Sequence, residues 1–339
     1  MRRVLVALVL AGALASVAGC ARPGPADGDL TDDWPALPAA RPFVPAAGVC
    51  LPRISAVAQA AGYETVDCAR PHLAETIHVG TVDGTATVPD RPATDTGPVP
   101  DGPTADRTPT DGPTSDRTPT DGPTADRAAT DGTVERPAAG SAALRAIRAD
   151  CDQRTREVLG GDWRSARLTL QVTLPSTAAW AAGARWYRCD LSETGSLDNN
   201  RPVVRSGSLR GALIGDSPLT HRCFDPKLIA DDLNYMAPVL CTEPHRAEFV
   251  GVYREREMSW ARFAAADDAV HRRCLGLIAE YAKVPNNGDL PYRVGSIFYP
   301  PSRQEWAEGD RGVRCFLWSD DRKLTRSMRG AGPAGLPAS

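Results

Sequence analysis

The sequence has little lysine and no strong excess of charge of either sign. Three lysines stand against 36 arginines among 339 residues, and the formal net charge is −3. Proteins that bind nucleic acid usually carry a basic patch or stripe on the binding domain. We therefore expect no nucleic-acid partner.

The chain also lacks an apolar run long enough for a membrane-spanning helix. Its main apolar run, Val4 to Val17, follows Arg2 and Arg3. As a helix this run would rise only about 21 Å, which is short of a bilayer core of roughly 30 Å. The order of charged, apolar and small residues is typical of an export signal. The sequence predicts a signal peptide over residues 1–19.

The small residues that end this run resemble a bacterial lipobox, Val17-Ala18-Gly19-Cys20. In that class the cysteine thiol receives a diacylglyceryl group and becomes the first mature residue, and two or three acyl chains hold a protein stably on a membrane. We expect lipidation of Cys20, a tether over residues 20–45, and a membrane-anchored, extracytoplasmic protein. The alternative is ordinary cleavage that leaves Cys20 a free thiol.

Common catalytic motifs are missing as well. The sequence has no Gly-x-Ser-x-Gly elbow, no His-Glu-x-x-His helix, no phosphate-binding Gly-x4-Gly-Lys and no dinucleotide fingerprint. It has five histidines, too few to supply a zinc site easily if the cysteines are oxidised. We expect neither an enzyme nor a bound cofactor or metal.

Cysteine, in contrast, is plentiful. Nine cysteines less the anchor leave eight, an even number that predicts four disulfides in an oxidising compartment.

The eight cysteines lie in an internal repeat. The pattern Cys-x17-Cys-x2-Pro-His-x2-Glu occurs twice without a gap, and so does a later Pro-Ser-x3-Trp-x2-Gly-x-Arg-x2-Arg-Cys. One more cysteine lies between these blocks in each copy. The first copy contributes Cys50, Cys68, His72, Glu75, Cys151, Trp180, Arg185, Arg188 and Cys189; the second contributes Cys223, Cys241, His245, Glu248, Cys274, Trp306, Arg311, Arg314 and Cys315.

The repeat predicts two tandem domains, over residues 46–192 and 217–322, with a linker at 193–216 and a flexible tail at 323–339. The first domain carries an insertion built on a ten-residue Asp-Gly-Pro-Thr repeat. That composition cannot bury enough apolar surface to offset the entropy of ordering, so we expect residues 83–139 to be disordered.

The equal spacing of the first two cysteines in both copies favours local pairing. The expected disulfides are Cys50–Cys68, Cys151–Cys189, Cys223–Cys241 and Cys274–Cys315. Each would add roughly 3 to 4 kcal/mol in the chain-entropy model. A pairing of first with fourth and second with third cysteine in each copy stays open.

Residue patterns predict the fold class. Runs at 168–174, 248–253 and 314–318 are rich in β-formers, and stretches at 55–61, 142–158 and 260–282 have apolar residues at helical spacing. We expect two small α+β domains, each held by disulfides.

Two sets of side chains are candidates for binding. His72 with Glu75, and His245 with Glu248, could hold a metal or exchange a proton, although a histidine that satisfies backbone groups is the plainer interpretation. Arg185 and Arg311 could present planar guanidinium groups to an anionic ligand, or could serve packing alone.

These motifs resemble the septum-formation domain family of actinobacterial envelope proteins. The resemblance covers both copies and implies an extracytoplasmic role in division or envelope biogenesis, with no catalytic residues to carry over. It favours a binding or scaffolding module for a division-complex protein or the cell wall. The alternatives are a sensor of a small ligand or metal, and a transport accessory.

Overall fold

The computed structural model describes residues 42–54, 62–82, 134–230, 232–320 and 322–336. The described residues from 42 onward form one compact unit. The predicted signal peptide, Cys20, most of the predicted tether, the predicted helix at 55–61 and most of the predicted insertion lie outside the described residues. We call residues 42–216 the first half and residues 217–336 the second half.

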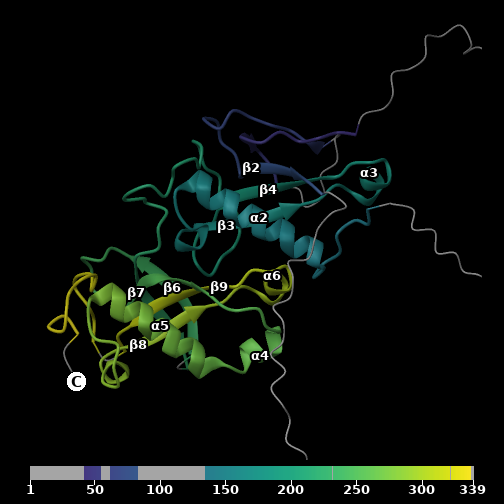
Figure 1. The fold of residues 1–339 in the computed structure, drawn as a ribbon. Coiled ribbons are helices and arrows are strands. Elements are labelled where there is room, and N and C mark those ends of the chain that lie inside the picture. The colour runs from purple at the N-terminus through teal and green to yellow at the C-terminus, as the bar shows by residue number, and fades with distance from the viewer. Residues whose placement is uncertain (1–41, 55–61, 83–133, 231, 321, 337–339) are drawn as a thin grey trace, which may run out of the picture. The chain divides into compact units, whose positions relative to one another are not determined.

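The first half contains a four-stranded antiparallel sheet in the order β1-β2-β4-β3. Helix α2 lies against β2, β3 and β4 (Figure 1), and the apolar faces of helix and sheet form a single core around Cys151, Leu170 and Leu191. The elements are β1 (Val49–Leu51), β2 (Ala74–Thr81), α2 (Ala142–Leu159), the 3-10 turn η2 (Trp163–Ser165), β3 (Leu168–Thr173), α3 (Thr177–Ala181) and β4 (Trp186–Glu193).

The second half contains a five-stranded antiparallel sheet in the order β6-β5-β7-β9-β8. Helix α5 packs on β7, β8 and β9 (Figure 1). The elements are β5 (Cys223–Ile229), β6 (Asp232–Val239), β7 (Ala247–Arg254), α4 (Trp260–Ala264), α5 (Asp267–Ala282), the 3-10 turn η3 (Leu290–Tyr292), β8 (Gly295–Tyr299), α6 (Arg303–Ala307) and β9 (Gly312–Trp318). The fold is therefore mixed helix and sheet.

The two sheets agree strand for strand apart from β6. In each, the first cysteine pairs across the ladder with the motif glutamate, Cys50 with Glu75 and Cys223 with Glu248. The register of β2 on β4 shifts between Thr76 and His78, and that of β7 on β9 shifts between Phe249 and Gly251, which is the corresponding place. The motif residues thus occupy matching positions in both sheets.

Four disulfides hold these elements, and they follow the local pairing. The bonds are Cys50–Cys68, Cys151–Cys189, Cys223–Cys241 and Cys274–Cys315. Cys151 and Cys274 lie on α2 and α5, and their partners lie on β4 and β9. Each half therefore has one bond from its first strand to a residue 18 positions later and one that ties the main helix to the sheet.

Local signals explain the ends of α2. The Ser141 side chain accepts a hydrogen bond from the Leu144 amide at the start, and Gly160 ends the helix in the left-handed conformation at φ 76°. The predicted continuous helix over 260–282 is wrong, because it divides into α4 and α5. The break at Ala265 and Ala266 lets Asp267 begin a new first turn, where a carboxylate interacts favourably with the helix dipole.

The predicted flexible tail is also wrong over the residues that the structure describes. Leu324, Met328 and Leu336 are buried in the core of the second half together with residues of α5. The tail has apolar residues spaced between its arginines, and burial of such side chains contributes roughly 1.5 to 3 kcal/mol each. That gain offsets the entropy of ordering the segment.

The predicted linker at 193–216 is likewise a packed segment. Leu209 is fully buried in the core of the first half, and Leu197 packs in an apolar cluster of the second half. Asp198 accepts hydrogen bonds from the Met236 amide (2.8 Å) and the Tyr299 hydroxyl (2.6 Å). This segment therefore joins the halves by contacts as well as by chain connection.

No helix in the described part of the chain is long and apolar enough to cross a membrane.

Candidate functional site

The His-Glu pair of the second half is completely buried. His245 and Glu248 each have 0% exposure. Nδ1 of His245 lies 2.7 Å from the backbone oxygen of Glu243, and Nε2 lies 3.0 Å from Oε1 of Glu248. Because His245 precedes β7, its ring turns back over the strand to reach the carboxylate.

Glu248 binds the C-terminal segment. Its carboxylate accepts hydrogen bonds from the Met328 amide (2.8 and 3.0 Å), the Ser327 hydroxyl (2.9 Å) and the Tyr281 hydroxyl (2.6 Å). Burial, together with the hydrogen bond to this carboxylate, raises the pKa of Tyr281 to about 12. The carboxylate thus fastens the chain end to α5 and the sheet.

Glu75 makes the same attachment in the first half. It accepts hydrogen bonds from the Ser208 hydroxyl (2.8 Å) and the Leu209 amide (2.6 Å). His72 exchanges two backbone hydrogen bonds with Arg205, both 2.9 Å, as His245 does with Leu324. The two glutamates are therefore equivalent attachments, whereas the rings differ, because Nε2 of His245 contacts its glutamate and Nε2 of His72 is buried without a hydrogen-bond partner.

The attached segments form a further shared motif that the two-block repeat did not include. Ser208-Leu209-Arg210-Gly211 corresponds to Ser327-Met328-Arg329-Gly330. The glycine amides donate to the last turn of the main helix, Gly211 to Val158 (2.8 Å) and Gly330 to Tyr281 (2.8 Å). The Ser-x-Arg-Gly pattern was visible in the sequence and would have placed both segments inside the folded halves.

A metal site at these pairs has few available ligands. Two groups in the described residues are spaced for an ion, Cys50, Cys68 and Glu75, and Cys223, His245 and Glu248. Metal ligation by cysteine requires a thiolate, and all three cysteines are in disulfides. The carboxylates already accept hydrogen bonds, so the donor set does not fit a metal while the disulfides are intact.

The paired Trp and Arg residues form a second kind of shared feature. Arg185 and Arg311 lie over the rings of Trp180 and Trp306, with guanidinium carbon to ring centroid distances of 4.5 and 4.4 Å. Each donates to the backbone oxygen of its own tryptophan, at 2.6 and 2.5 Å. Each arginine therefore satisfies carbonyl groups at the end of a short helix, α3 or α6, and stacks on its indole.

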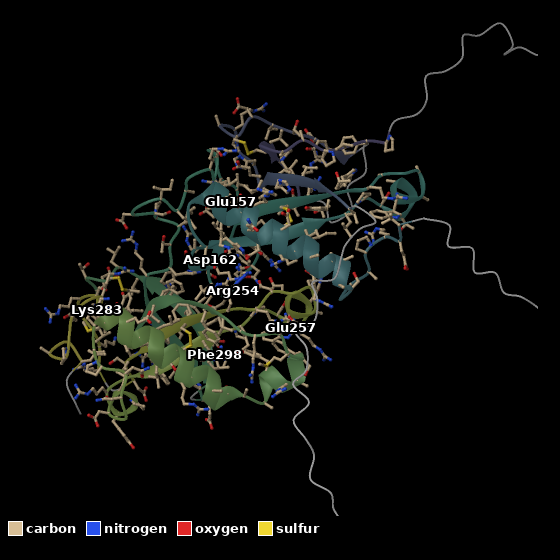
Figure 2. All side chains as sticks on the ribbon, viewed as in Figure 1. Glu157, Asp162, Arg254, Glu257, Lys283 and Phe298 are labelled. Atoms are coloured by element: carbon tan, nitrogen blue, oxygen red, sulfur yellow. A yellow bond between two sulfur atoms is a disulfide. The ribbon has the colours of Figure 1, made fainter. Side chains whose placement is uncertain are left out.

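Buried charges join the two halves. Nε and NH2 of Arg164 donate to Oδ1 of Asp310 (3.0 and 2.7 Å), and NH1 donates to Oδ1 of Asp152 (2.6 Å). Arg254 of β7 also contacts Asp152. Arg254 and Asp162, labelled in Figure 2, both lie at this junction. Arg164, Asp152 and Asp310 are all at most 3% exposed.

The charges in this cluster are mutually compensated. Burial by itself would raise the pKa of Asp310, but the guanidinium groups of Arg164 and then Arg148 hold that pKa below its ordinary value. Arg164 and Arg254 do the same for Asp152. The close approach also requires Gly312, because a Cβ there would lie 2.3 Å from the Arg164 side chain. The cluster is specific to the contact between halves and has no counterpart in the shared motifs.

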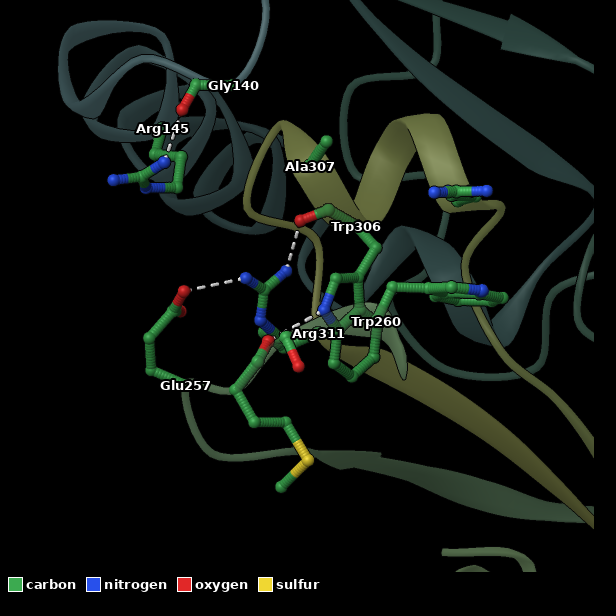
Figure 3. A pocket seen from close by; sticks show the side chains of 10 residues that line it. Gly140, Arg145, Glu257, Trp260, Trp306, Ala307 and Arg311 are labelled. Atoms are coloured by element: carbon green, nitrogen blue, oxygen red, sulfur yellow. Dashed lines mark hydrogen bonds and ion pairs between the residues drawn. The ribbon is translucent and has the colours of Figure 1, made fainter. Parts of the chain in front are cut away.

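An open cleft of about 470 Å³ lies beside this junction. Its walls come from the start of α2 in the first half and from the β7–α4 connection, α6 and Arg311 in the second. Figure 3 shows Arg311 between the Glu257 carboxylate and the backbone of Trp306, with Arg145 on the opposite side. The residues that line the cleft are Gly140, Arg145, Glu257, Met258, Ser259, Trp260, Arg303, Trp306, Ala307 and Arg311.

A family model described as "Septum formation" matches residues 125–315, more than half of the chain. The chain belongs to the septum formation family. In this septum formation protein the match takes in α2, the later strands as far as the middle of β9, the charged junction and the cleft, whereas β1 and β2 precede it. Comparisons with curated proteins and with solved structures find no match.

Proposed function

We propose that this protein is a lipid-anchored, extracytoplasmic binding and scaffolding protein of the cell envelope that acts in septum formation. The family match carries the division-related part of the proposal. Four disulfides are typical of proteins that fold in an oxidising compartment outside the cytoplasm. The lipobox-like Val17-Ala18-Gly19-Cys20 supplies the attachment to the membrane.

Two tandem copies of one domain make up the extracytoplasmic part in this proposal. Equivalent strand order, equivalent disulfides and the three shared motifs support it. The repetitive segment within 83–139 serves as a spacer. The motif side chains are engaged in holding each fold together, which supports recognition of a partner rather than chemistry at the motifs.

Localisation of a functional fluorescent fusion in growing cells tests the proposal. We expect enrichment at division sites and its loss in Cys20→Ala, because the thiol is the site of acylation. Ser16→Ala, which changes the leader but keeps the lipobox, is the matched control and should localise as the unmodified protein does. An even distribution around the envelope would contradict the septal role and would favour the sensor or the transport accessory.

A further inference from the structure

The cleft at the junction of the halves has one apolar wall. Trp260 is half-buried and meets the ring of Trp306 edge to face, with centroids 5.6 Å apart. Met258 lies beside them and accepts a hydrogen bond from Nε1 of Trp306 through its backbone oxygen. A flat indole surface of this kind accepts an apolar side chain with little loss of conformational freedom.

The other walls are cationic. Arg303 is exposed on α6, and no side-chain hydrogen bond or ion pair holds its guanidinium among the residues described. Arg145 donates from one terminal nitrogen to the Gly140 backbone oxygen, and no hydrogen bond or ion pair engages its other side-chain nitrogens within the described residues. Guanidinium groups with free donors suit the planar, bidentate geometry of a carboxylate.

Arg311 adds positive charge to the wall of the cleft, although its terminal nitrogens already donate to Trp306, Asp310 and Glu257. The residue is 8% exposed and lines the cleft, and its Nε is buried without a hydrogen-bond partner.

The start of α2 contributes to the same field. Gly140 lines the cleft directly before the N-cap residue Ser141, and the first turn of this 18-residue helix has no acidic residue. The amide end of the helix dipole therefore favours an anion here. Glu257, whose side chain is 74% exposed, is the acidic residue at the rim.

We infer that this cleft binds an acidic peptide segment of a protein partner, with its carboxylates on Arg145 and Arg303 and an adjacent apolar side chain on Trp260. The volume fits a few side chains. The negative charge of Glu257 would repel a uniformly charged polyanion, whereas a peptide can place its carboxylates away from Glu257. The inference rests on the proposed binding function and gives it a site and a ligand class.

Fluorescence anisotropy with the purified disulfide-bonded protein tests the inference directly. The probe is a fluorescein-labelled decapeptide of alternating glutamate and leucine, in about 150 mM salt so that weak surface attraction is screened. We expect saturable binding, and at least about tenfold weaker binding of the same peptide with glutamine in place of glutamate.

Matched variants assign the binding to the cleft. Arg145→Glu combined with Arg303→Glu should weaken binding by about tenfold or more, and Trp260→Ala by about fivefold. Arg201→Glu combined with Arg272→Glu changes the net charge equally at exposed positions that do not line the cleft, and should bind as the unmodified protein does. If the double variant does not fold, Arg303→Glu alone replaces it, because this residue is exposed. Its circular dichroism should be unchanged and its binding weaker.

Three results would overturn the inference: no saturable binding, an equal loss of binding in the control pair, or binding of the glutamine peptide as tight as that of the glutamate peptide. This assay needs no membrane and no division site. Failure of binding with correct septal localisation would therefore reject the cleft alone, and binding without septal localisation would reject only the septal role.

Discussion

At the scale of single residues, the motif side chains act inside the protein. His245 and Glu248 are buried, and the carboxylate accepts several hydrogen bonds from the C-terminal segment. Buried carboxylates are stable in proteins when they are hydrogen-bonded in this way. The His-Glu spacing is therefore explained by packing, which was the plainer of the two interpretations of the sequence.

His221 is a buried histidine outside these motifs, and it makes a testable contribution to acid sensitivity. Its ring packs against Phe224, Phe249 and Phe316. Burial, and then the nearby charge of Arg314, lowers its pKa to about 3. The ring is consequently neutral in the folded protein at neutral pH.

The unfolded chain binds a proton at His221 below about pH 6.5, whereas the folded chain does so only near pH 3. Stability should therefore fall as the pH is lowered through this window, by up to about 1.4 kcal/mol per pH unit from this group. His221→Gln should remove that part of the slope in urea unfolding between pH 7 and pH 4, although it lowers stability at pH 7. Equal slopes in both proteins would show that His221 does not contribute.

At the scale of elements, each half is completed by a segment without regular secondary structure. The Ser-x-Arg-Gly segments donate to the motif glutamate and to the end of the main helix, and they place Leu209 and Met328 in the two cores. Without these segments, the apolar end of each main helix would be exposed to water. The segments therefore cover the core of each half at the end of α2 or α5.

Met328→Ala should lower the free energy of unfolding by about 2 to 5 kcal/mol, because it removes a side chain that is 3% exposed. Arg326→Ala, two residues earlier and exposed, should change it by less than about 0.5 kcal/mol. Urea unfolding monitored by tryptophan fluorescence measures both. A similar, small effect of the two substitutions would mean that the segment adds little to stability.

At the scale of the whole molecule, the halves are joined by charged residues that have no equivalent at the corresponding positions of the other half. Arg164 comes from the first half and Asp310 from the second, and both are buried at the contact. Corresponding positions differ, since Ala184 stands where the second half has Asp310. The contact between the halves therefore depends on residues that differ between them.

Asp310→Ala should lower the free energy of unfolding by about 3 to 5 kcal/mol, because it leaves the buried guanidinium of Arg164 without its main partner. Asp320→Ala is the control, since it makes the same substitution at an exposed position just beyond β9. Denaturant unfolding of both variants, with disulfides intact, gives the comparison. If Asp310→Ala costs no more than Asp320→Ala, the charged junction does not hold the halves together.

The sequence by itself determined the parts of this protein that depend on local spacing. The gapless Cys-x17-Cys interval indicated the local disulfide pairing, and β-rich runs at 168–174, 248–253 and 314–318 correspond to β3, β7 and β9. The family resemblance followed from motifs at fixed offsets. Such features are encoded within short stretches, where residue order alone sets the geometry.

Only the tertiary structure decided how distant residues meet. The partners of Arg164 lie 12 and 146 residues away, and the cleft combines Arg145 with Trp260 and Arg303. In residues 323–336 the shared Ser-x-Arg-Gly pattern was the one sequence signal of burial, and the positions of Leu324, Met328 and Leu336 in the core are apparent only from the structure. Packing between the halves is a property of two surfaces, and a single sequence pattern does not specify which surfaces come together.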